Sequence, residues 1–148
     1  MYKVIVAGTD GSPTATVAFR KAIELAKLMG ATLHVVHAHQ LAAAHQAAAG
    51  IGSVDVGSVN QTIKGDSARV CSDAIAMAAR DDVEVVPHST SGDPADALVA
   101  VAEDVDADLI VVGSRGMQGA RRFVLGSVPN KVSHHSPCSL LIVDTARG

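Results

Sequence analysis

The chain has 148 residues and a formal net charge of −3, and aromatic residues make up 2% of it. This length suits a single domain, residues 1–148, whose core is large enough to be stable without disulfides or metals. Few aromatic residues argue against a protein that stacks single-stranded nucleic acid, and the lack of a basic excess argues against a general DNA-binding protein. We therefore expect no nucleic-acid partner.

The cysteines and the start of the chain bear on the cellular compartment. Cys71 and Cys138 belong to no Cys-x-x-Cys pair, which favours two buried or half-buried thiols in a reducing compartment over a zinc or redox site. The first residues show no signal-peptide pattern, and no apolar run approaches the ~18–20 residues that span a bilayer. The sequence therefore predicts a cytoplasmic protein without a membrane partner.

Short apolar runs alternate with longer helical patterns along the chain. Such runs, without polar alternation, are typical of parallel strands that are covered on both faces. They predict strands at residues 4–7, 32–38, 83–86, 109–112 and 140–143. The resulting order is βαβαβαβαβ, and right-handed crossovers then produce a doubly wound sheet. We expect a Rossmann-like α/β fold in three layers, with a five-stranded parallel sheet between two layers of helices.

The predicted helices have recognisable ends. Ser12 and Asp93 each precede a proline, which is the pattern of an N-cap before a proline at the first helical position. Ser127 is predicted to cap a last helix that ends near residue 135. A further helix is predicted over residues 66–80, with an inward face formed by Cys71, Ala74, Ile75 and Ala78.

Residues 40–65 follow no clear pattern. The alanine-rich part, 40–50, is compatible with a helix, whereas 50–65 is rich in glycine, serine and valine and predicts a loop. We find no internal repeat and no second domain.

Glycine-rich turns follow the first and fourth predicted strands. Ligands of open α/β sheets bind beyond the carboxyl ends of the strands, where the strand order reverses. The first turn reads Gly-Thr-Asp-Gly-Ser from Gly8, and the second reads Gly-Ser-Arg-Gly from Gly113. In the second turn, Gly113 and Gly116 allow the backbone to approach an anion closely. Farther on, Gly126 and Ser127 open a helix whose N–H groups and serine hydroxyl form a phosphate site.

Basic residues gather around this second turn. A locally basic segment in an acidic chain is what a polyphosphate ligand requires, and it consists of Arg115, Arg121, Arg122 and Lys131. The chain has neither Gly-x4-Gly-Lys-Ser/Thr nor, after its first strand, Gly-x-Gly-x-x-Gly. These absences exclude a P-loop NTPase and disfavour NAD binding.

The spacing of the later glycines is that of a known family. Gly113, Gly116, Gly126 and Ser127 give the pattern Gly-x2-Gly-x9-Gly-Ser, which resembles the ATP-binding branch of the universal stress protein family. Further segments that resemble the family are 4–12, 32–38, 126–132 and 136–143. The resemblance covers nearly the whole chain except residues 40–65, a region that varies in length within the family.

This resemblance implies a site for an adenine nucleotide. It would place Asp10 beside the ribose and phosphates, as the candidate contact to a nucleotide-bound Mg²⁺, with Gly8 and Thr9 in the same turn. Ala38 would meet the edge of the adenine. The residues that would wrap the ribose and phosphates are Val112, Gly113, Arg115 and Gly116, and those that would hold the terminal phosphates are Gly126, Ser127 and Val128.

The resemblance also implies a homodimer. In the family the last strand, here 140–143, pairs with its copy across a two-fold axis. Without such a partner this strand would be an exposed apolar edge, which is a liability for a soluble protein.

Other interpretations stay open at this stage. Asp10 is also explained as a turn residue that needs no ligand. His34 and His37 face opposite sides of a strand, and His134 and His135 point to different faces of a helix, so neither pair predicts a metal site.

No nucleophile is placed beside a base, and binding a phosphate does not by itself accelerate its hydrolysis. Enzymatic activity is therefore left open. The sequence predicts a regulatory or stress-response protein that binds ATP or AMP. The alternatives are a protein that binds cyclic AMP and a slow Mg²⁺-dependent ATPase.

Overall fold

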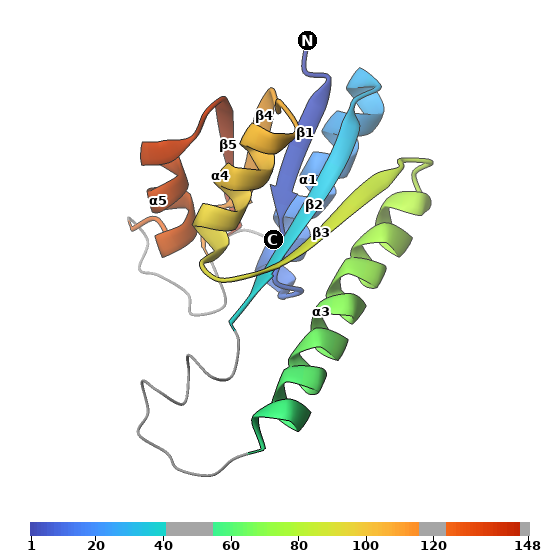
Figure 1. Cartoon of the computed structure of the whole chain (residues 1–148). Helices are drawn as coiled ribbons and strands as arrows, with labels where there is room; N and C mark the ends of the chain where they lie inside the picture. Colours follow the sequence, from blue (N-terminus) through green and yellow to red (C-terminus); the bar gives the residue numbers. More distant parts are fainter. Residues whose placement is uncertain (41–54, 116–123, 146–148) are drawn as a thin grey trace.

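A computed structural model describes residues 1–40, 55–115 and 124–145 of the chain. Strands and helices alternate along it (Figure 1): β1 (Val4–Gly8), α1 (Pro13–Met29), β2 (Thr32–His39), α3 (Val56–Ala79), β3 (Val85–Ser91), α4 (Pro94–Asp104), β4 (Leu109–Gly113), α5 (Ser127–His135) and β5 (Ser139–Val143). The five strands form one parallel sheet in the order β3-β2-β1-β4-β5. The predicted α/β class and sheet type are therefore confirmed.

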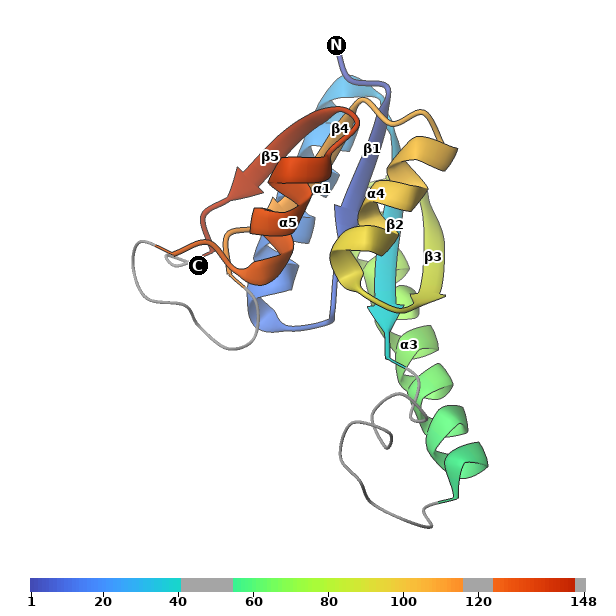
Figure 2. The ribbon, with the colours of Figure 1, turned by 60° about the vertical axis from the view of Figure 1, so that its left-hand side comes forward.

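Two layers of helices cover the sheet. Figures 1 and 2 show α1 and α3 on one face and α4 and α5 on the other. Each face has its own core, because side chains alternate along a strand. In β1, Ile5 and Ala7 pack towards α1 and α3, whereas Val6 packs towards α4 and α5. The central strands are continuous apolar runs because both of their faces are buried.

β3 differs from the predicted third strand. The sequence predicts 83–86, but the strand runs over Val85–Ser91. β3 pairs only with β2, so it is an edge strand, and most of its residues are partly or fully exposed. An edge strand tolerates Pro87 and the polar residues that follow it, and these residues disguise its true length. Val83 precedes the strand but still packs in the core.

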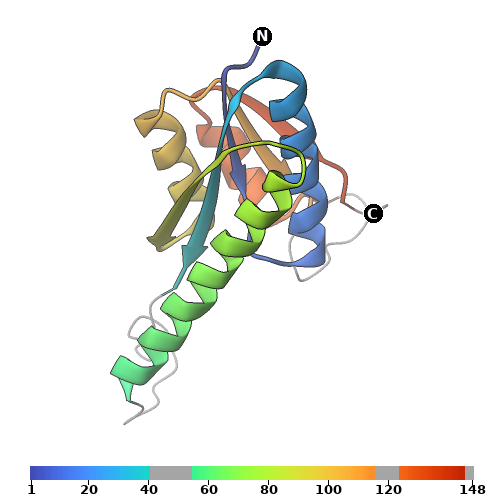
Figure 3. The ribbon, with the colours of Figure 1, turned by 90° about the vertical axis from the view of Figure 1, so that its right-hand side faces the viewer.

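α3 begins earlier than predicted. Its N-cap is Asp55, whose carboxylate accepts a hydrogen bond from the N–H of Gly57 at 3.1 Å. The predicted loop is therefore wrong for residues 56–65. Figure 3 shows that this first part of α3 reaches beyond the ends of the strands, so packing against the sheet imposes no apolar pattern on it. The rest of the uncertain region, 41–54, lies outside the described residues.

The helices turn narrow apolar faces to the sheet. On α3, Cys71, Ala74 and Ala78 are buried as predicted, but Ile75 is 39% exposed. The reason is that α3 covers only the side of the sheet formed by β2 and β3, so a residue one step around the helix from Ala74 already meets solvent.

No helix within the described ranges is both long enough and apolar enough to cross a membrane.

Candidate functional site

A cleft lies at the carboxyl ends of the strands, where the order of the sheet reverses. β1 and β4 are neighbours in the sheet, but β1 leads to α1 on one face and β4 leads to α5 on the other. Chain segments that leave neighbouring strands for opposite faces leave a crevice between them. The cleft there measures about 710 Å³, counted with the solvent in its mouth. Its position is the one expected for a ligand of an open α/β sheet.

The residues predicted to form a site come together around this cleft. Those within the described ranges all line it: Gly8, Thr9, Asp10, Ala38, Val112, Gly113, Arg115, Gly126, Ser127 and Val128. Gly116 lies outside the described residues. Lining residues that the sequence did not predict are Ala15, Val36, Pro94, Leu98 and Pro129. Pro94 carried a usable signal, because it starts a helix at the carboxyl edge of the sheet, where ligands bind.

Apolar side chains form the floor of the cleft. Val36, Leu98 and Val112 belong to the core between the sheet and the α4–α5 layer, and they extend that core up to the cleft. Gly8 allows Leu98 to come close, since a Cβ at Gly8 would lie 3.1 Å from Cδ1 of Leu98. A floor of this kind suits a flat, largely apolar ring.

The turn between β1 and α1 satisfies its own hydrogen bonds. The N–H of Ser12 donates to Oδ1 of Asp10 at 2.9 Å, and the N–H of Gly11 donates to Oγ1 of Thr9 at 3.2 Å. Ser12 also caps α1, because its Oγ accepts from the N–H of Ala15 at 3.2 Å. These N–H groups are therefore not available to an anion. Asp10 acts as a turn residue through one oxygen, which leaves the other oxygen for a cation.

A histidine connects this turn to β2. Nδ1 of His37 lies 2.9 Å from the carbonyl oxygen of Thr9, and a carbonyl can only accept, so Nδ1 carries the proton. The N–H of Thr9 donates in turn to the carbonyl of Val36 at 3.0 Å. Together these bonds fix the end of β1 beside the end of β2, where Ala38 lines the cleft.

His34, earlier in β2, has a different partner. Nδ1 of His34 lies 2.9 Å from Nε2 of His88, and burial, followed by the charge of His88, lowers the pKa of His34. His34 and His37 therefore do not share a ligand. In the part of the chain that the structure describes, no group of three or more His, Cys, Asp or Glu side chains is placed to hold a metal ion.

The start of α5 has no side-chain cap. Its N-cap is Gly126, with φ −59° and ψ 164°, and no side chain of the described residues forms a capping hydrogen bond there. The other helices in the described ranges are capped by Ser12, Asp55 and Asp93. The prediction that Ser127 is the cap is wrong by one position, because glycine occupies the cap and Ser127 is the first helical residue. The exposed hydroxyl of Ser127 is therefore left for another partner.

The uncapped helix start leaves hydrogen-bond donors at the cleft. The N–H of Gly126 donates to the carbonyl of Ser114 at 2.9 Å, but those of Ser127 and Val128 have no acceptor among the described residues. Pro129 has no N–H to satisfy. Two N–H groups, one hydroxyl and the positive end of the helix dipole form a favourable environment for an anion.

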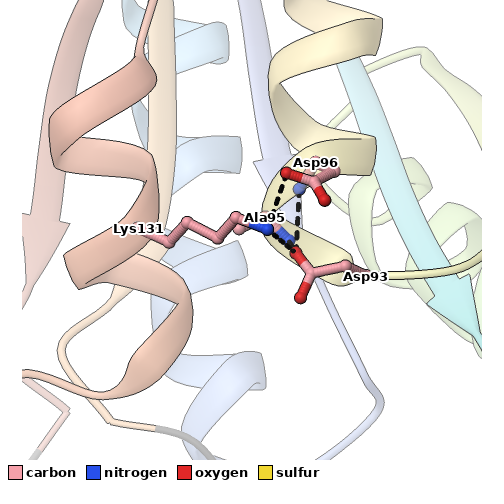
Figure 4. A network of polar contacts seen from close by, with 4 residues as sticks. All are labelled: Asp93, Ala95, Asp96 and Lys131. Carbon is pink, nitrogen blue, oxygen red and sulfur yellow. Dashed lines mark hydrogen bonds and ion pairs between the residues drawn. The ribbon is translucent and has the colours of Figure 1, made fainter.

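One of the predicted basic residues is engaged elsewhere. Nζ of Lys131 lies 2.7 Å from Oδ1 of Asp96 and 3.2 Å from Oδ1 of Asp93, and Figure 4 shows it reaching from α5 to the start of α4. The hydrogen bond to Asp96 raises the pKa of Lys131. Lys131 thus joins the two helices that flank the cleft instead of lining it, while Arg115 does line it. Arg121 and Arg122 lie outside the described residues.

The lining of the cleft offers several groups that can bind a ligand. Its described lining residues include no histidine, cysteine or lysine, so the hydroxyls of Thr9 and Ser127 have no such base beside them in the lining. The lining combines apolar side chains, the N–H donors at the start of α5, Arg115 and the carboxylate of Asp10. A molecule with a flat ring at one end and an anionic group at the other would use all of these features.

A family model and a curated relative both match nearly the whole chain. The model of the universal stress protein family matches residues 1–144 of the chain. Universal stress protein YxiE of Bacillus subtilis is 31% identical over 147 residues, which cover 97% of this chain and 99% of that protein.

Two solved structures are similar over almost the whole chain. A universal stress protein in complex with cAMP has a TM-score of 0.70 and 30% identity, with 97% of this chain and 98% of that chain covered. The universal stress protein of Archaeoglobus fulgidus in complex with dAMP has a TM-score of 0.67 and 25% identity, with 97% and 98% covered.

Proposed function

Because the chain belongs to the universal stress protein family, we propose that its cleft binds an adenine nucleotide, ATP or AMP, and that the bound nucleotide regulates a stress response. The observation that carries this proposal is the uncapped start of α5 at one end of an apolar cleft. The free N–H groups of such a helix start and its positive dipole end favour the binding of an anion. The relatives that bind cAMP and dAMP support an adenine ring with a phosphate as that ligand.

The chemistry of the lining suggests how the nucleotide lies. The adenine would rest on Val36 and Leu98 with its edge at Ala38, at the end of the cleft that offers apolar surface. The phosphates would lie at the other end, on the N–H groups of Ser127 and Val128, with Arg115 beside them. The ribose would bridge the two ends near Gly8, Gly113 and Val112.

A nucleotide-bound Mg²⁺ fits the remaining donors. Magnesium is held by carboxylate and phosphate oxygens, usually with few protein ligands. Asp10 has one carboxylate oxygen left after its bond to Ser12. We propose this oxygen as the contact of the protein to the ion, which would supply charge neutralisation for the phosphates.

Cyclic AMP is the second candidate, and the charge of the cleft favours it. Lys131 is paired with two carboxylates, which leaves Arg115 as the cation among the described lining residues. A cyclic phosphodiester carries one negative charge and needs less neutralisation than a triphosphate. The structure at 30% identity that holds cAMP supports the same choice.

The open edge of β5 supports the proposal that the protein forms a homodimer through this strand. β5 pairs with β4 on one side only, and its residues Leu140, Leu141, Ile142 and Val143 are all partly exposed. Pairing with a second copy would bury this edge. Sedimentation of wild type and Ile142→Pro tests it, since the proline removes an N–H from the strand. A variant that sediments like wild type contradicts the dimer.

Localisation in the cytoplasm stays a prediction of the sequence.

Calorimetric titration of the purified protein with ATP, AMP and cyclic AMP, with and without Mg²⁺, tests the nucleotide site. Saturable binding of any of the three supports it, and the order of affinities decides between the two candidates. Asp10→Asn is expected to reduce the Mg²⁺-dependent part of ATP binding and to leave cyclic AMP binding unchanged. GTP serves as the control ligand. Absence of saturable binding for all three adenine nucleotides contradicts the proposal.

A further inference from the structure

Ser114 lies between two lining residues of the cleft without lining it. Gly113 and Arg115, on either side of it, both line the cleft. The N–H of Ser114 donates to the carbonyl oxygen of Val143 at 2.8 Å, and its own carbonyl accepts from the N–H of Gly126 at 2.9 Å. Its backbone thus connects the end of β5 to the N-cap of α5.

The side chain of Ser114 has a buried partner. Thr145 lies just after β5 and is 6% exposed. Its N–H donates to Oγ of Ser114 at 3.1 Å, and the two hydroxyl oxygens are 3.3 Å apart. Every polar group of Ser114 is therefore used, and the buried N–H of Thr145 depends on it for an acceptor.

Thr145 also packs against the glycine of the cleft. A Cβ placed on Gly113 would lie 3.0 Å from Cγ2 of Thr145, so the methyl group fills the space where a larger residue would put its side chain. The pair formed by Ser114 and Thr145 therefore sets the position of Gly113 on one side and of Gly126 on the other. The N–H groups of Ser127 and Val128 follow directly after Gly126 along the helix.

We propose that Ser114 and Thr145 are positioning residues for the phosphate end of the ligand, an inference that rests on the proposed function. The pair fixes the separation between Gly113, beside the ribose, and the start of α5, and this separation determines whether the phosphates reach the N–H groups there. The adenine end is built from β2 and α4, to which the pair makes no hydrogen bond among the described residues. Loosening the pair therefore weakens the binding of the phosphates and spares the binding of the ring.

Titration of ATP and adenosine into Ser114→Ala, Thr145→Val and wild type tests this assignment. Ser114→Ala leaves the N–H of Thr145 without an acceptor, and the affinity for ATP is expected to fall about tenfold, which corresponds to about 1.4 kcal/mol. Thr145→Val keeps the shape and the N–H, so a loss of about threefold is expected. Adenosine affinity should change by less than about twofold in both variants.

Ser133→Ala is the matched control, because it removes a hydroxyl bonded at 2.7 Å to the carbonyl of Asn130 on the exposed side of α5. It should leave both affinities unchanged. A purely structural role of Ser114 would lower the melting temperature and leave the ratio of ATP to adenosine affinities at its wild-type value. That result overturns the proposal. If wild type binds no nucleotide at all, the proposed function fails instead.

A measurement without ligand tests the packing itself. Gly113→Ala sets a Cβ against Cγ2 of Thr145, and Thr145→Ser removes that methyl group while it keeps the hydroxyl. In a double-mutant cycle, the loss of melting temperature caused by Gly113→Ala should shrink by at least half in the Thr145→Ser background. Additive losses would show that Thr145 does not hold Gly113, whatever the protein binds.

Discussion

The N-termini of α1 and α5 follow the two glycine-rich turns of the carboxyl edge, but they leave their N–H groups in different states. At α1, Ser12 caps the helix, and the side chains of Thr9 and Asp10 take the N–H groups of the turn. At α5, Gly126 offers no side chain, and the N–H groups of the first turn stay without an acceptor among the described residues. The start of α1 is capped by a side chain of the chain itself, whereas the start of α5 has no such cap among the described residues.

Because of this difference, we expect one helix start to contribute mainly to the stability of the fold and the other mainly to the affinity for a ligand. A group that is satisfied in the folded chain contributes to the free energy of unfolding with or without ligand. A group that is satisfied only by a ligand contributes through the affinity, and it stabilises the protein only when the ligand is present. Substitutions in the turn after β1 should therefore act on stability, and those around the start of α5 should act on affinity.

The largest effect is expected at Gly113. Gly113→Val adds a branched side chain whose Cβ would lie 3.0 Å from Cγ2 of Thr145, so we expect this part of the cleft lining to shift. Calorimetry should show an ATP affinity about five- to 150-fold lower, which corresponds to overpacking costs of about 1–3 kcal/mol. Gly65→Ala is the control, because a Cβ there meets nothing within 4 Å. If Gly113→Val binds ATP with wild-type affinity, the prediction that this glycine is needed for binding is contradicted.

Gly11 lies in the turn after β1 and has a left-handed backbone conformation. Its φ is 77°, and a Cβ would lie 3.1 Å from Cγ2 of Val70. Gly11→Ala should lower the free energy of unfolding in urea by about 1–2 kcal/mol, because a left-handed conformation is costly for alanine. ATP affinity of the folded variant should stay within about twofold of wild type. If Gly11→Ala weakens ATP binding as strongly as Gly113→Val does, the assignment of the turn after β1 to stability alone is contradicted.

Ser127→Ala tests the open helix start directly. The hydroxyl caps nothing in the unliganded chain, so the free energy of unfolding should change by less than about 0.5 kcal/mol. ATP should bind about fivefold more weakly, since one hydrogen bond of about 1 kcal/mol is lost. Parallel urea unfolding and calorimetry give both values, and a loss of stability without a loss of affinity would reverse the assignment.

Ser12→Ala should show the opposite signature. Its Oγ accepts from the N–H of Ala15 at 3.2 Å, and removing such a cap costs about 1 kcal/mol of stability. Affinity for ATP should not change. The same two measurements apply, and an unchanged free energy of unfolding would mean that the cap contributes nothing.

Asp93 extends the comparison to a charged cap and gives the smallest effect. The backbone N–H of Asp96, and then Lys131, lower the pKa of Asp93 below its ordinary value of 3.8. This carboxylate therefore stabilises the fold above that value, and the contribution is lost as the pH falls through the lowered pKa. Asp93→Asn keeps a capping side chain, so its unfolding free energy should fall less steeply below about pH 4. Equal acid dependence in the two proteins would contradict this.

Burial decides how much of the fold could be predicted from the sequence. β1 and β4 lie in the middle of the sheet, and their runs of valine and isoleucine predict them within one residue. β3 is an edge strand with polar residues, and the start of α3 extends past the sheet, so neither has an apolar pattern that marks its limits. An apolar pattern in the sequence indicates where an element contacts the core. It therefore does not mark the limits of an element that extends beyond the core.

The residues of the site also fall into those that could be predicted from the sequence and those that could not. The glycine spacing indicated the turn after β4 and the start of α5, and the family resemblance to which it led supplied the other predicted residues that line the cleft. Val36 and Leu98 were missed because they are also core residues. The bonds from Lys131 to Asp93 and between Thr145 and Ser114 join residues 38 and 31 positions apart, and no local pattern predicts such pairs.

The two edges of the sheet differ in what they offer to another chain. β3 contains Pro87, which has no N–H to extend a ladder of hydrogen bonds, whereas β5 reads Ser-Leu-Leu-Ile-Val and contains no proline. A sheet that can grow at both edges can add copies without limit, as fibres do. Two copies that join through β5 leave only their β3 edges outward, and these do not accept a further strand readily. Growth of the described sheet by strand pairing would therefore end at a closed pair.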